Sequence, residues 1–340
     1  MALNLIVGPP NSNRAGEVLA RLRAALDESP LLVVPTGDDI VRFERDLCAG
    51  GVAQVGVTIR TFGSLFDEIA SMTATPVPPR LSPPQRLALV RAAVSSTDLR
   101  VLRRSSRSPG FALALDTLIA ELQAALVSSA DLRDAAKGAE GDSVQEAELA
   151  RLYSEYERLR DGAGRSDGGS VAAAAVAALR ADPGAWGETP VFIYGFDDLT
   201  EVQLETVRIL ADACDITFAV NYADRNALAA RAGLRARLDE EGGKVVSELA
   251  FDPSYAARKS LAHLAEHVFE TDARKVDPFD GGLALRASAG ERGEAETVGI
   301  EIARLLSNGT AADDIVVALR RPSVEGPVVA SVLREMGIPA

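Results

Sequence analysis

The chain has 340 residues, of which 47% are hydrophobic and 25% charged, a composition typical of a globular protein with room for two domains. It contains no apolar run near the roughly 20 residues of a membrane span and begins without a basic leader, so we expect a cytoplasmic protein without membrane contact. Its net charge of −13 disfavours a strongly basic nucleic-acid surface on this segment.

Strand and helix patterns alternate at the start of the chain and again from residue 188. Buried-strand patterns occupy residues 3–7, 31–35, 55–59, 190–194 and 216–220. Helical patterns occupy residues 16–26, residues 38–48, the stretch after Thr61 and residues 201–213. Strands that alternate with helices imply a parallel sheet with helical crossovers. We therefore expect one α/β domain made of residues 1–75 and 188–225.

A proline-rich connector, "TPVPPRLSPP", interrupts this domain. The residues that follow have helical periodicity and no strand pattern, with helices expected at residues 85–95, 111–127, 144–160 and 171–179. The breaks between these helices are rich in turn formers. We therefore expect an all-helical insertion over residues 76–187.

The chain continues with a polar stretch and a second α/β pattern. Residues 226–280 carry one or two helices and are expected to form a helical connector. Strands are expected at residues 281–290 and 313–321, around a helix at residues 294–306, and a last helix follows at residues 328–336. This pattern lacks its next strand, so we expect residues 281–340 to begin a second α/β domain of a longer protein.

The stretch "GPPNSNRAG" joins the first strand to the first helix. A phosphate-binding loop reads G-x-x-x-x-G-K-[ST], in which glycines free the backbone, the lysine reaches the outer phosphates and the hydroxyl binds Mg²⁺. Gly8 matches this pattern, but Asn13, Arg14 and Ala15 replace the second glycine, the lysine and the hydroxyl. Arg14 could still meet a phosphate at the helix N-terminus, whereas Ala15 cannot bind a metal. Taken alone, the stretch fits either a plain strand–turn–helix or a degenerate phosphate-binding loop.

A second strand–turn–helix, "VFIYGFDDLTEVQLETVRIL", resembles the Walker B region of superfamily-1 helicases. Phe196 and Asp198 match that motif. The Asp-Glu pair that binds Mg²⁺ and orients the attacking water is replaced by Tyr194 and Gly195. The stretch is also compatible with a strand tip followed by an acidic helix cap. We expect this turn and the first loop to lie side by side at the carboxyl ends of their strands.

Several stretches together resemble the AddB/RexB proteins, the second subunits of bacterial RecBCD-type helicase–nucleases. In chain order these stretches are "VTIRTFGSLFDEIA", "ELARLYSEYERLRDGAGRSDGGSVAAAAVAAL", "GFDDLTEVQLETVRILADACDITFAVNY", "GERGEAETVGIEIARLLSNGTAADDIVVALR" and "LREMGIPA". The resemblance covers nearly the whole chain in the order of the family. It implies a P-loop NTPase-like, superfamily-1 helicase fold. In that fold, residues 1–75 and 188–225 are domain 1A, residues 76–187 are a 1B-like insertion and residues 281–340 begin domain 2A.

The resemblance also implies site residues, partners and cofactors. The degenerate nucleotide site of such a fold would fall on Gly8, Asn13, Arg14, Ala15 and Arg320. Thr61 stands in the family's motif Ia, which implies a contact with DNA. The implied partners are DNA double-strand ends and an AddA-like helicase–nuclease subunit. The family's PD-(D/E)XK nuclease and any iron–sulfur cluster lie C-terminal to this segment, so we expect no cofactor here.

Basic residues cluster inside the expected helical insertion, at Arg100, Arg103, Arg104 and Arg107. In helicases of this type, the insertion flanks DNA. The four arginines are therefore either a DNA-binding surface or a solvated loop. No aromatic residues interleave with them for base stacking, which favours the solvated loop.

The chain's only two histidines lie in "HLAEH", residues 263–267, which fits the H-x-x-E-H zinc motif. Leu261, Leu264 and Val268 form the apolar stripe of this helix, so both histidines face its polar side. A third ligand would have to come from a distant carboxylate, and no residue is an obvious candidate. We expect a solvated helix face and no metal site.

These patterns favour a function without a motor. The lysine, the hydroxyl and the carboxylate pair act on the same nucleotide and metal, and all are replaced, so we expect neither ATP hydrolysis nor Mg²⁺ binding. Our hypothesis is a helicase-like scaffold that handles DNA ends for an active partner in double-strand-break repair. Two alternatives stay open: an ATP-hydrolysing helicase domain that uses Arg14 with unconventional metal ligands, and an interaction module that binds neither nucleotide nor DNA.

Overall fold

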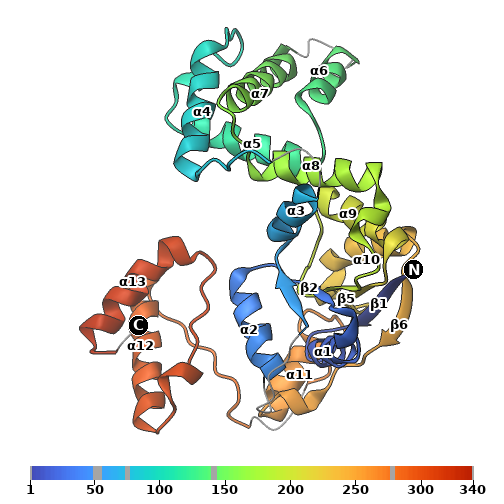
Figure 1. Ribbon diagram of the computed structural model, residues 1–340. Helices are drawn as coiled ribbons and strands as arrows, with labels where there is room; N and C mark the ends of the chain where they lie inside the picture. The colour runs from blue at the N-terminus through green and yellow to red at the C-terminus, as the bar shows by residue number, and fades with distance from the viewer. Residues whose placement is uncertain (1, 49–55, 73–76, 139–143, 276–279, 339–340) are drawn as a thin grey trace. The chain divides into compact units, whose positions relative to one another are not determined.

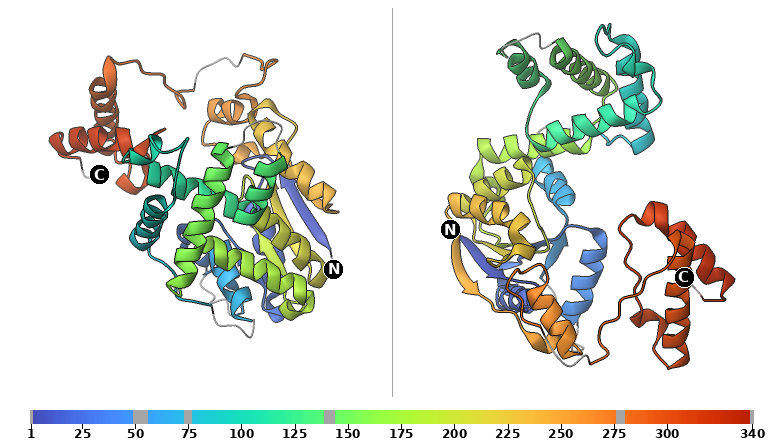
Figure 2. Two further views of the ribbon diagram at one scale, coloured as in Figure 1. Left: turned by 90° about the horizontal axis from the view of Figure 1, so that it is seen from above. Right: turned by 180° about the vertical axis from the view of Figure 1, so that it is seen from behind.

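The computed structural model describes residues 2–48, 56–72, 77–138, 144–275 and 280–338. It divides into two compact units, which we describe separately. Unit 1 comprises Met1–Tyr255 with Ala265–Ala273, and unit 2 comprises Ala256–Leu264 with Arg274–Ala340. The elements of each unit are drawn in Figure 1 and, from two further sides, in Figure 2.

A six-stranded, all-parallel sheet lies at the centre of unit 1 (Figure 1). Its strands are β1 (Leu3–Gly8), β2 (Leu31–Val33), β3 (Thr58–Arg60), β4 (Val191–Ile193), β5 (Ile216–Asn221) and β6 (Lys244–Glu248). They are arranged in the order β3-β2-β4-β5-β1-β6. The predicted α/β fold is confirmed, as is one sheet shared by strands before and after the insertion. Of the strand predicted at residues 55–59, Val55 lies outside the described residues.

Helices cover both faces of this sheet, because successive side chains of a strand point to opposite sides. These helices are α1 (Arg14–Ala24), α2 (Gly37–Cys48), α3 (Phe62–Ser71), α9 (Glu201–Ala213) and α10 (Ala232–Glu240). α1 and α2 share a core with Ile6 and Leu32, whereas α3, α9 and α10 share a core with Leu5 and Val33. The carboxyl ends of the strands meet at one edge of this three-layer arrangement, where open α/β sheets place their sites.

The insertion is helical, as predicted, within its described residues. Its helices are α4 (Pro83–Ser96), α5 (Phe111–Ala124), α6 (Ser129–Gly138), α7 (Val144–Gly162) and α8 (Gly168–Ala181). The sequence did not predict α6, whose ten residues are too few for a clear period. α8 packs against α3 and α9, while α4, α5 and α7 share a separate core around Tyr156.

An isolated parallel bridge between Arg80 and Ser166 ties the entry of the insertion to the turn between α7 and α8. Pro76 of the predicted connector lies outside the described residues. Within the part of the chain that the structure describes, no single helix combines the length and hydropathy needed to cross a membrane. α5 taken with Ser129–Lys137 of α6 meets that criterion only as a pair, across a 94° bend.

The segment predicted as a helical connector, residues 226–280, contributes to the sheet. It carries α10, β6 and α11 (Lys259–His267), and α11 contains both histidines. The sequence did not predict β6, because Lys244–Glu248 mixes two valines with polar residues and alternates only briefly. β6 pairs with β1, with a register shift between Leu5 and Ile6, and forms one edge of the sheet. The sheet therefore extends past residue 225.

Unit 2 contains two long helices, α12 (Gly290–Ser307) and α13 (Pro322–Glu335). The buried apolar residues among the described part of this unit are few: Ala295, Ile302, Val332, Leu333 and Ile338. A hollow of about 480 Å³ opens beside α12 and is lined in part by Arg286, Val298, Leu305 and Val317. Unit 2 therefore has a much smaller core than unit 1.

The two strands predicted in unit 2 are not formed. Residues 282–288 and 315–319 belong to neither helix nor strand. Among the described residues they have no strand partner, and a strand exists only through the hydrogen bonds of its ladder. Ile315 and Val317 pack against the small core of unit 2, whereas Leu285 is 94% and Val316 is 86% exposed. The segments have an apolar pattern, but within the described residues they lack the pairing that a strand requires.

Candidate functional site at the carboxyl ends of the strands

The loop after β1 turns sharply into α1. Asn11 and Asn13 have positive φ angles of 59° and 61°, a left-handed conformation that asparagine tolerates better than most residues. A Cβ at Gly8 would lie 2.5 Å from Ser12 Oγ, and one at Gly16 would lie 2.3 Å from Asn13 Oδ1. The Asn13 side chain therefore folds over the first turn of α1, where a phosphate-binding loop has a glycine. Ser12 Oγ is buried and has no hydrogen-bond partner among the described residues.

The Arg14 side chain is bound by acceptors of the protein itself. Its Nη2 donates to Asn221 Oδ1 at 3.0 Å, and its Nε donates to the carbonyl oxygen of Pro9 at 3.3 Å. Burial lowers the pKa of Arg14, while the neighbouring Tyr194 and Asp197 act to raise it. The residue that replaces the phosphate-binding lysine thus has partners inside the fold.

Asn221, at the end of β5, links Arg14 to the turn after β4. Asn221 Nδ2 donates to Asp197 Oδ1 at 3.5 Å, and Arg231 donates to both carboxylate oxygens of Asp197 at 2.7 Å. The bidentate hydrogen bond from Arg231 is the main cause that lowers the pKa of Asp197. We call Arg14, Asn221, Asp197 and Arg231 the Arg14 cluster. It extends across the carboxyl ends of β1, β5 and β4.

The loop and the turn lie at the same end of the sheet, at the carboxyl ends of β1 and β4, but they are not directly side by side as expected. β5 lies between β1 and β4 in the sheet, so the two connections are not direct neighbours. Asn221 connects them instead, with Arg14 on one side and Asp197 on the other. A hydrolytic site on this scaffold would therefore have to include the end of β5.

Residues 249–255, which follow β6, also contact the loop. Asp252 donates its backbone N–H to the carbonyl oxygen of Asn11 at 2.8 Å. The Tyr255 hydroxyl donates to Asn13 Oδ1 at 2.9 Å. Both asparagines of the loop are thus bound by a segment of the same unit, which holds the loop in its observed conformation.

The turn after β4 is anchored by aromatic packing. The rings of Tyr194 and Phe43 meet edge-on with centroids 5.1 Å apart, and those of Phe196 and Phe62 do the same at 5.1 Å. Gly195 has a φ of 91°, which a residue with a side chain rarely adopts. In the described residues, no group of three or more His, Cys, Asp or Glu side chains is arranged to hold a metal ion. Of the two positions that match the Walker B-like motif, Phe196 therefore serves packing here.

The remaining predicted residues of the nucleotide and DNA sites lie on separate elements. Ala15 lies in the first turn of α1, beside Arg14. Asp198 is 79% exposed, and Arg320 is exposed in unit 2, shortly before α13. Thr61 caps α3, where its Oγ1 accepts the backbone N–H of Ser64 at 3.4 Å. Of the predicted nucleotide-site residues, Gly8, Asn13, Arg14 and Ala15 thus lie together at the junction of β1 and α1, and Arg320 lies apart in unit 2.

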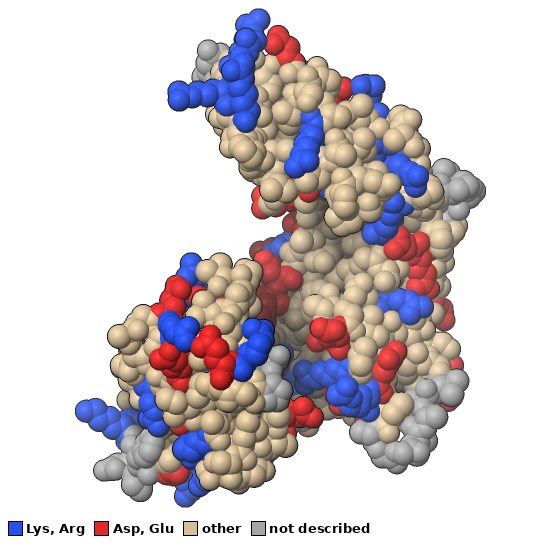
Figure 3. Space-filling model, turned by 90° about the vertical axis from the view of Figure 1, so that its left-hand side faces the viewer, with Lys and Arg blue, Asp and Glu red and all other residues tan. Residues whose placement is uncertain are grey.

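The four predicted DNA-binding arginines lie in the turn between α4 and α5, residues 98–107, which we call the arginine turn. All four side chains are exposed. Arg103 pairs with Asp98 at 3.2 Å, whereas Arg100, Arg104 and Arg107 form no ion pair within the described residues. Figure 3 shows Lys and Arg side chains gathered at the far end of the helical insertion. Three of the four guanidinium groups in the turn therefore carry a charge without an ion-pair partner among the described residues.

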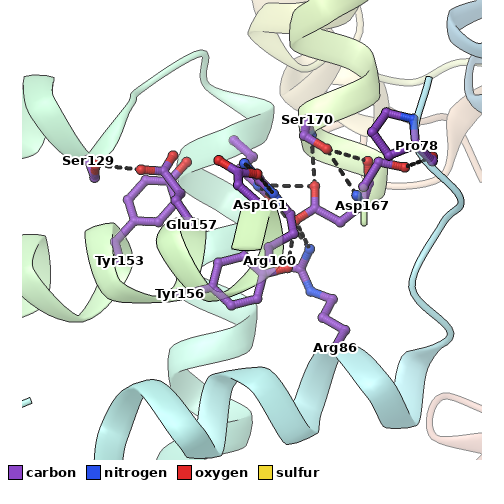
Figure 4. A network of polar contacts seen from close by, with 12 residues as sticks. Pro78, Arg86, Ser129, Tyr153, Tyr156, Glu157, Arg160, Asp161, Asp167 and Ser170 are labelled. Carbon is purple, nitrogen blue, oxygen red and sulfur yellow. Dashed lines mark hydrogen bonds and ion pairs between the residues drawn. The ribbon is translucent and has the colours of Figure 1, made fainter. Parts of the chain in front are cut away.

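A buried polar network in the insertion was not predicted from the sequence (Figure 4). The Asp167 side chain is 2% exposed and accepts hydrogen bonds from the Tyr156 hydroxyl at 2.6 Å and the Ser170 backbone N–H at 2.7 Å. Arg86 and Arg160 approach the same carboxylate at 3.2 and 3.3 Å. Because these groups bind one another, the network joins α4, α7 and α8.

No family model matches the chain, and no curated protein sequence is significantly similar to it. A functional assignment therefore depends on the sequence patterns and on the geometry of the loop, the Arg14 cluster and the arginine turn.

Proposed function

We propose that the chain is a non-motor, helicase-like scaffold segment of a double-strand-break repair helicase–nuclease subunit similar to AddB/RexB. In this role it handles DNA ends together with an active AddA-like partner in the cytoplasm. The order of the matching stretches along the chain supports the proposal, as does a parallel sheet whose first strand enters a phosphate-loop-like turn. The P-loop helicase identity of this α/β fold is part of the proposal.

The observation that carries the non-motor role is the engagement of the loop by its own protein. Arg14 is hydrogen-bonded to Asn221, and Asn13 accepts a hydrogen bond from Tyr255. The loop also lacks the metal-binding hydroxyl at Ala15, and the strand tip at Tyr194 lacks a carboxylate pair. Hydrolysis of a nucleotide needs a cation on the phosphates, a metal ligand and a residue that orients water. Here the cation, Arg14, is bound by the protein itself, and the metal ligand and the water-orienting residue are replaced.

An ATP-hydrolysing domain is the alternative that one contact favours. Asp197 lies two residues beyond the expected carboxylate position and reaches Arg14 through Asn221. A bound nucleotide would have to displace Arg231 from Asp197 before that carboxylate could serve a metal. The interaction-only alternative expects no DNA binding. The scaffold proposal expects DNA binding by the arginine turn.

Phosphate release from ATP in the presence of Mg²⁺ tests the non-motor role. We expect no turnover above background, because both metal-binding positions are replaced. A variant that restores only the loop, Asn13→Gly with Arg14→Lys and Ala15→Thr, should also stay inactive, since the carboxylate pair is still missing. Turnover by the unaltered chain that Arg14→Ala abolishes would overturn the proposal and support the ATPase alternative.

A further inference from the structure

The arginine turn is held in place by a buried carboxylate. Glu148, on α7, is fully buried and accepts the backbone N–H groups of Arg100, Val101 and Leu102 at 2.6, 3.2 and 2.9 Å. Successive N–H groups that converge on one anion form a concavity of the kind called a nest. In this turn the protein supplies the anion itself, so the main chain over these three residues is fixed.

Apolar packing is a second contact that holds the arginine turn in place. Leu99 and Leu102 are 5% and 9% exposed and belong to the core shared by α4, α5 and α7. Burial acts to raise the pKa of Glu148, but the three backbone N–H groups, together with Arg151 at 3.5 Å, outweigh it and lower that pKa, so the carboxylate is ionised at neutral pH. The turn is therefore anchored through its backbone and its leucines.

Because the turn is anchored through its backbone and its leucines, three of its guanidinium groups take no part in holding it. Arg100, Arg104 and Arg107 are exposed and form no ion pair among the described residues. Arg103 differs, because it pairs with Asp98 and donates to the carbonyl oxygen of its own turn at Leu99. In a chain with a net charge of −13, three unpaired arginines within eight residues are a local excess of positive charge.

We propose that Glu148 is a positioning residue that pre-orders Arg100, Arg104 and Arg107 for contact with the phosphate backbone of DNA. The proposal rests on the proposed DNA-handling function and adds the group that shapes the contact surface. Ordering a mobile segment on binding reduces affinity, and a turn that is already fixed in the free protein avoids part of that loss. Glu148 acts through the turn and does not itself touch DNA.

Charge and position lead to opposite expectations for this residue. The Glu148 carboxylate is an anion directly beneath the arginines, so removing its charge alone would strengthen binding to a polyanion. Removing a positioning group would weaken binding, because the turn would lose its fixed conformation. The sign of the change in affinity therefore separates the two roles.

The experiment compares the unaltered 340-residue chain with Glu148→Gln in titrations of fluorescein-labelled duplex DNA at several low salt concentrations. We expect the affinity to fall about tenfold and the slope of log K against log salt to flatten by about one unit, as for one lost phosphate contact. Hydrogen exchange at the amides of Arg100 and Leu102 should accelerate in the variant. Glu148→Asp keeps the charge with a shorter reach and should bind with intermediate affinity, which provides a second variant if Glu148→Gln does not fold.

The matched control is Tyr156→Phe, which removes one buried hydrogen bond from the Asp167 network and leaves the arginine turn untouched. Its affinity and slope should equal those of the unaltered chain. Equal or tighter binding by Glu148→Gln, or unchanged amide exchange in the turn, would overturn the positioning role. If a variant with glutamate at Arg100, Arg104 and Arg107 binds like the unaltered chain, or if the unaltered chain shows no binding at low salt, the DNA-contacting role of the turn itself fails.

Discussion

A buried carboxylate is stable only where hydrogen bonds and cations replace its lost hydration. Asp167 meets this requirement through Tyr156, the Ser170 N–H and two arginines. Gln123 donates to the same carboxylate from α5, at 3.2 Å. One side chain therefore couples α4, α5 and α7 to the start of α8 (Figure 4).

This carboxylate gives the protein a pH dependence of defined sign. Burial acts to raise the pKa of Asp167, but the hydrogen bonds of Tyr156 and Ser170 and the two arginines outweigh it and lower that pKa to about 2. A lowered folded-state pKa contributes stability that is present above the unfolded value of about 3.9 and is lost as the pH falls toward the folded value. The affected window thus lies between about pH 5 and about pH 2.

We expect the free energy of unfolding of the unaltered chain to fall across this window by about 2 kcal/mol more than that of Asp167→Asn, which has no titrating group at this position. Urea unfolding at a series of pH values measures the difference. Asp161→Asn is the control, since that carboxylate pairs with the same Arg160 but is 65% exposed. Parallel pH profiles for the unaltered chain and Asp167→Asn would contradict the prediction.

The candidate site shows which single residues a sequence can reveal. Asn13, Arg14 and Ala15 were identified because a motif assigns a chemical role to each position. Asn221 and Tyr255 were missed, although they bind Arg14 and Asn13. These partners are 207 and 242 residues away along the chain, and no local pattern encodes a contact of that separation. Only the order of the strands brings them to the loop.

Among the helices, α5 and α8 approach so closely that one position requires glycine. A Cβ at Gly169 would lie 2.4 Å from the Gln123 side chain, which is buried and hydrogen-bonded to Asp167. Gln123 therefore cannot move aside without breaking that contact. At the preceding Gly168, the nearest atom to such a Cβ is Arg80 Nη1 at 3.8 Å, which is ordinary contact.

We expect Gly169→Ala to lower the free energy of unfolding by about 1–3 kcal/mol, the usual cost of overpacking, despite the better helix propensity of alanine. Gly168→Ala should be neutral or stabilise the protein by up to about 1 kcal/mol, because it meets no such neighbour. Thermal unfolding of the two variants checks the difference. If Gly168→Ala were less stable than Gly169→Ala, the prediction would be wrong, because Gln123 would then make room for the added Cβ at low cost.

Elements with long apolar periods and explicit caps were predictable. α9 begins and ends at the predicted residues, where Thr200 and Gln203 form a capping box. Strands are harder to predict from the sequence, because a strand forms only where a second strand pairs with it. Lys244–Glu248 has a weak apolar pattern and is a strand, since β1 lies beside it. Residues 282–288 have a stronger pattern and no partner among the described residues.

At the scale of the whole molecule, the two units differ in the amount of apolar surface that they bury. The sheet of unit 1 has a buried core on each face. The described residues of unit 2 include only five buried apolar side chains: Ala295, Ile302, Val332, Leu333 and Ile338. Regions with few buried contacts open locally at lower free energy than the rest of a protein.

We therefore expect amides of α12 and α13 to exchange with solvent at least about tenfold faster than those of β1 and β5 under native conditions. Hydrogen exchange followed by mass spectrometry resolves both regions in one experiment. Helices α1 and α9 serve as the internal control, because they have the same secondary structure as α12 but pack on the sheet. If the amides of α9 and α12 exchanged at equal rates, the prediction would be wrong, because interactions other than the few buried apolar side chains would then stabilise unit 2.

The unpaired segments around Leu285 and Val316 affect how the protein behaves at high concentration. Backbone donors and acceptors outside any ladder are available to another molecule, and apolar side chains beside them favour intermolecular β-pairing. Self-association of the chain should therefore start in unit 2, although unit 1 is far larger. A lysine at position 285 would oppose it, because charge on an open edge disfavours the approach of a second strand. We therefore expect solubility to depend on residues that play no part in the loop, the Arg14 cluster or the arginine turn.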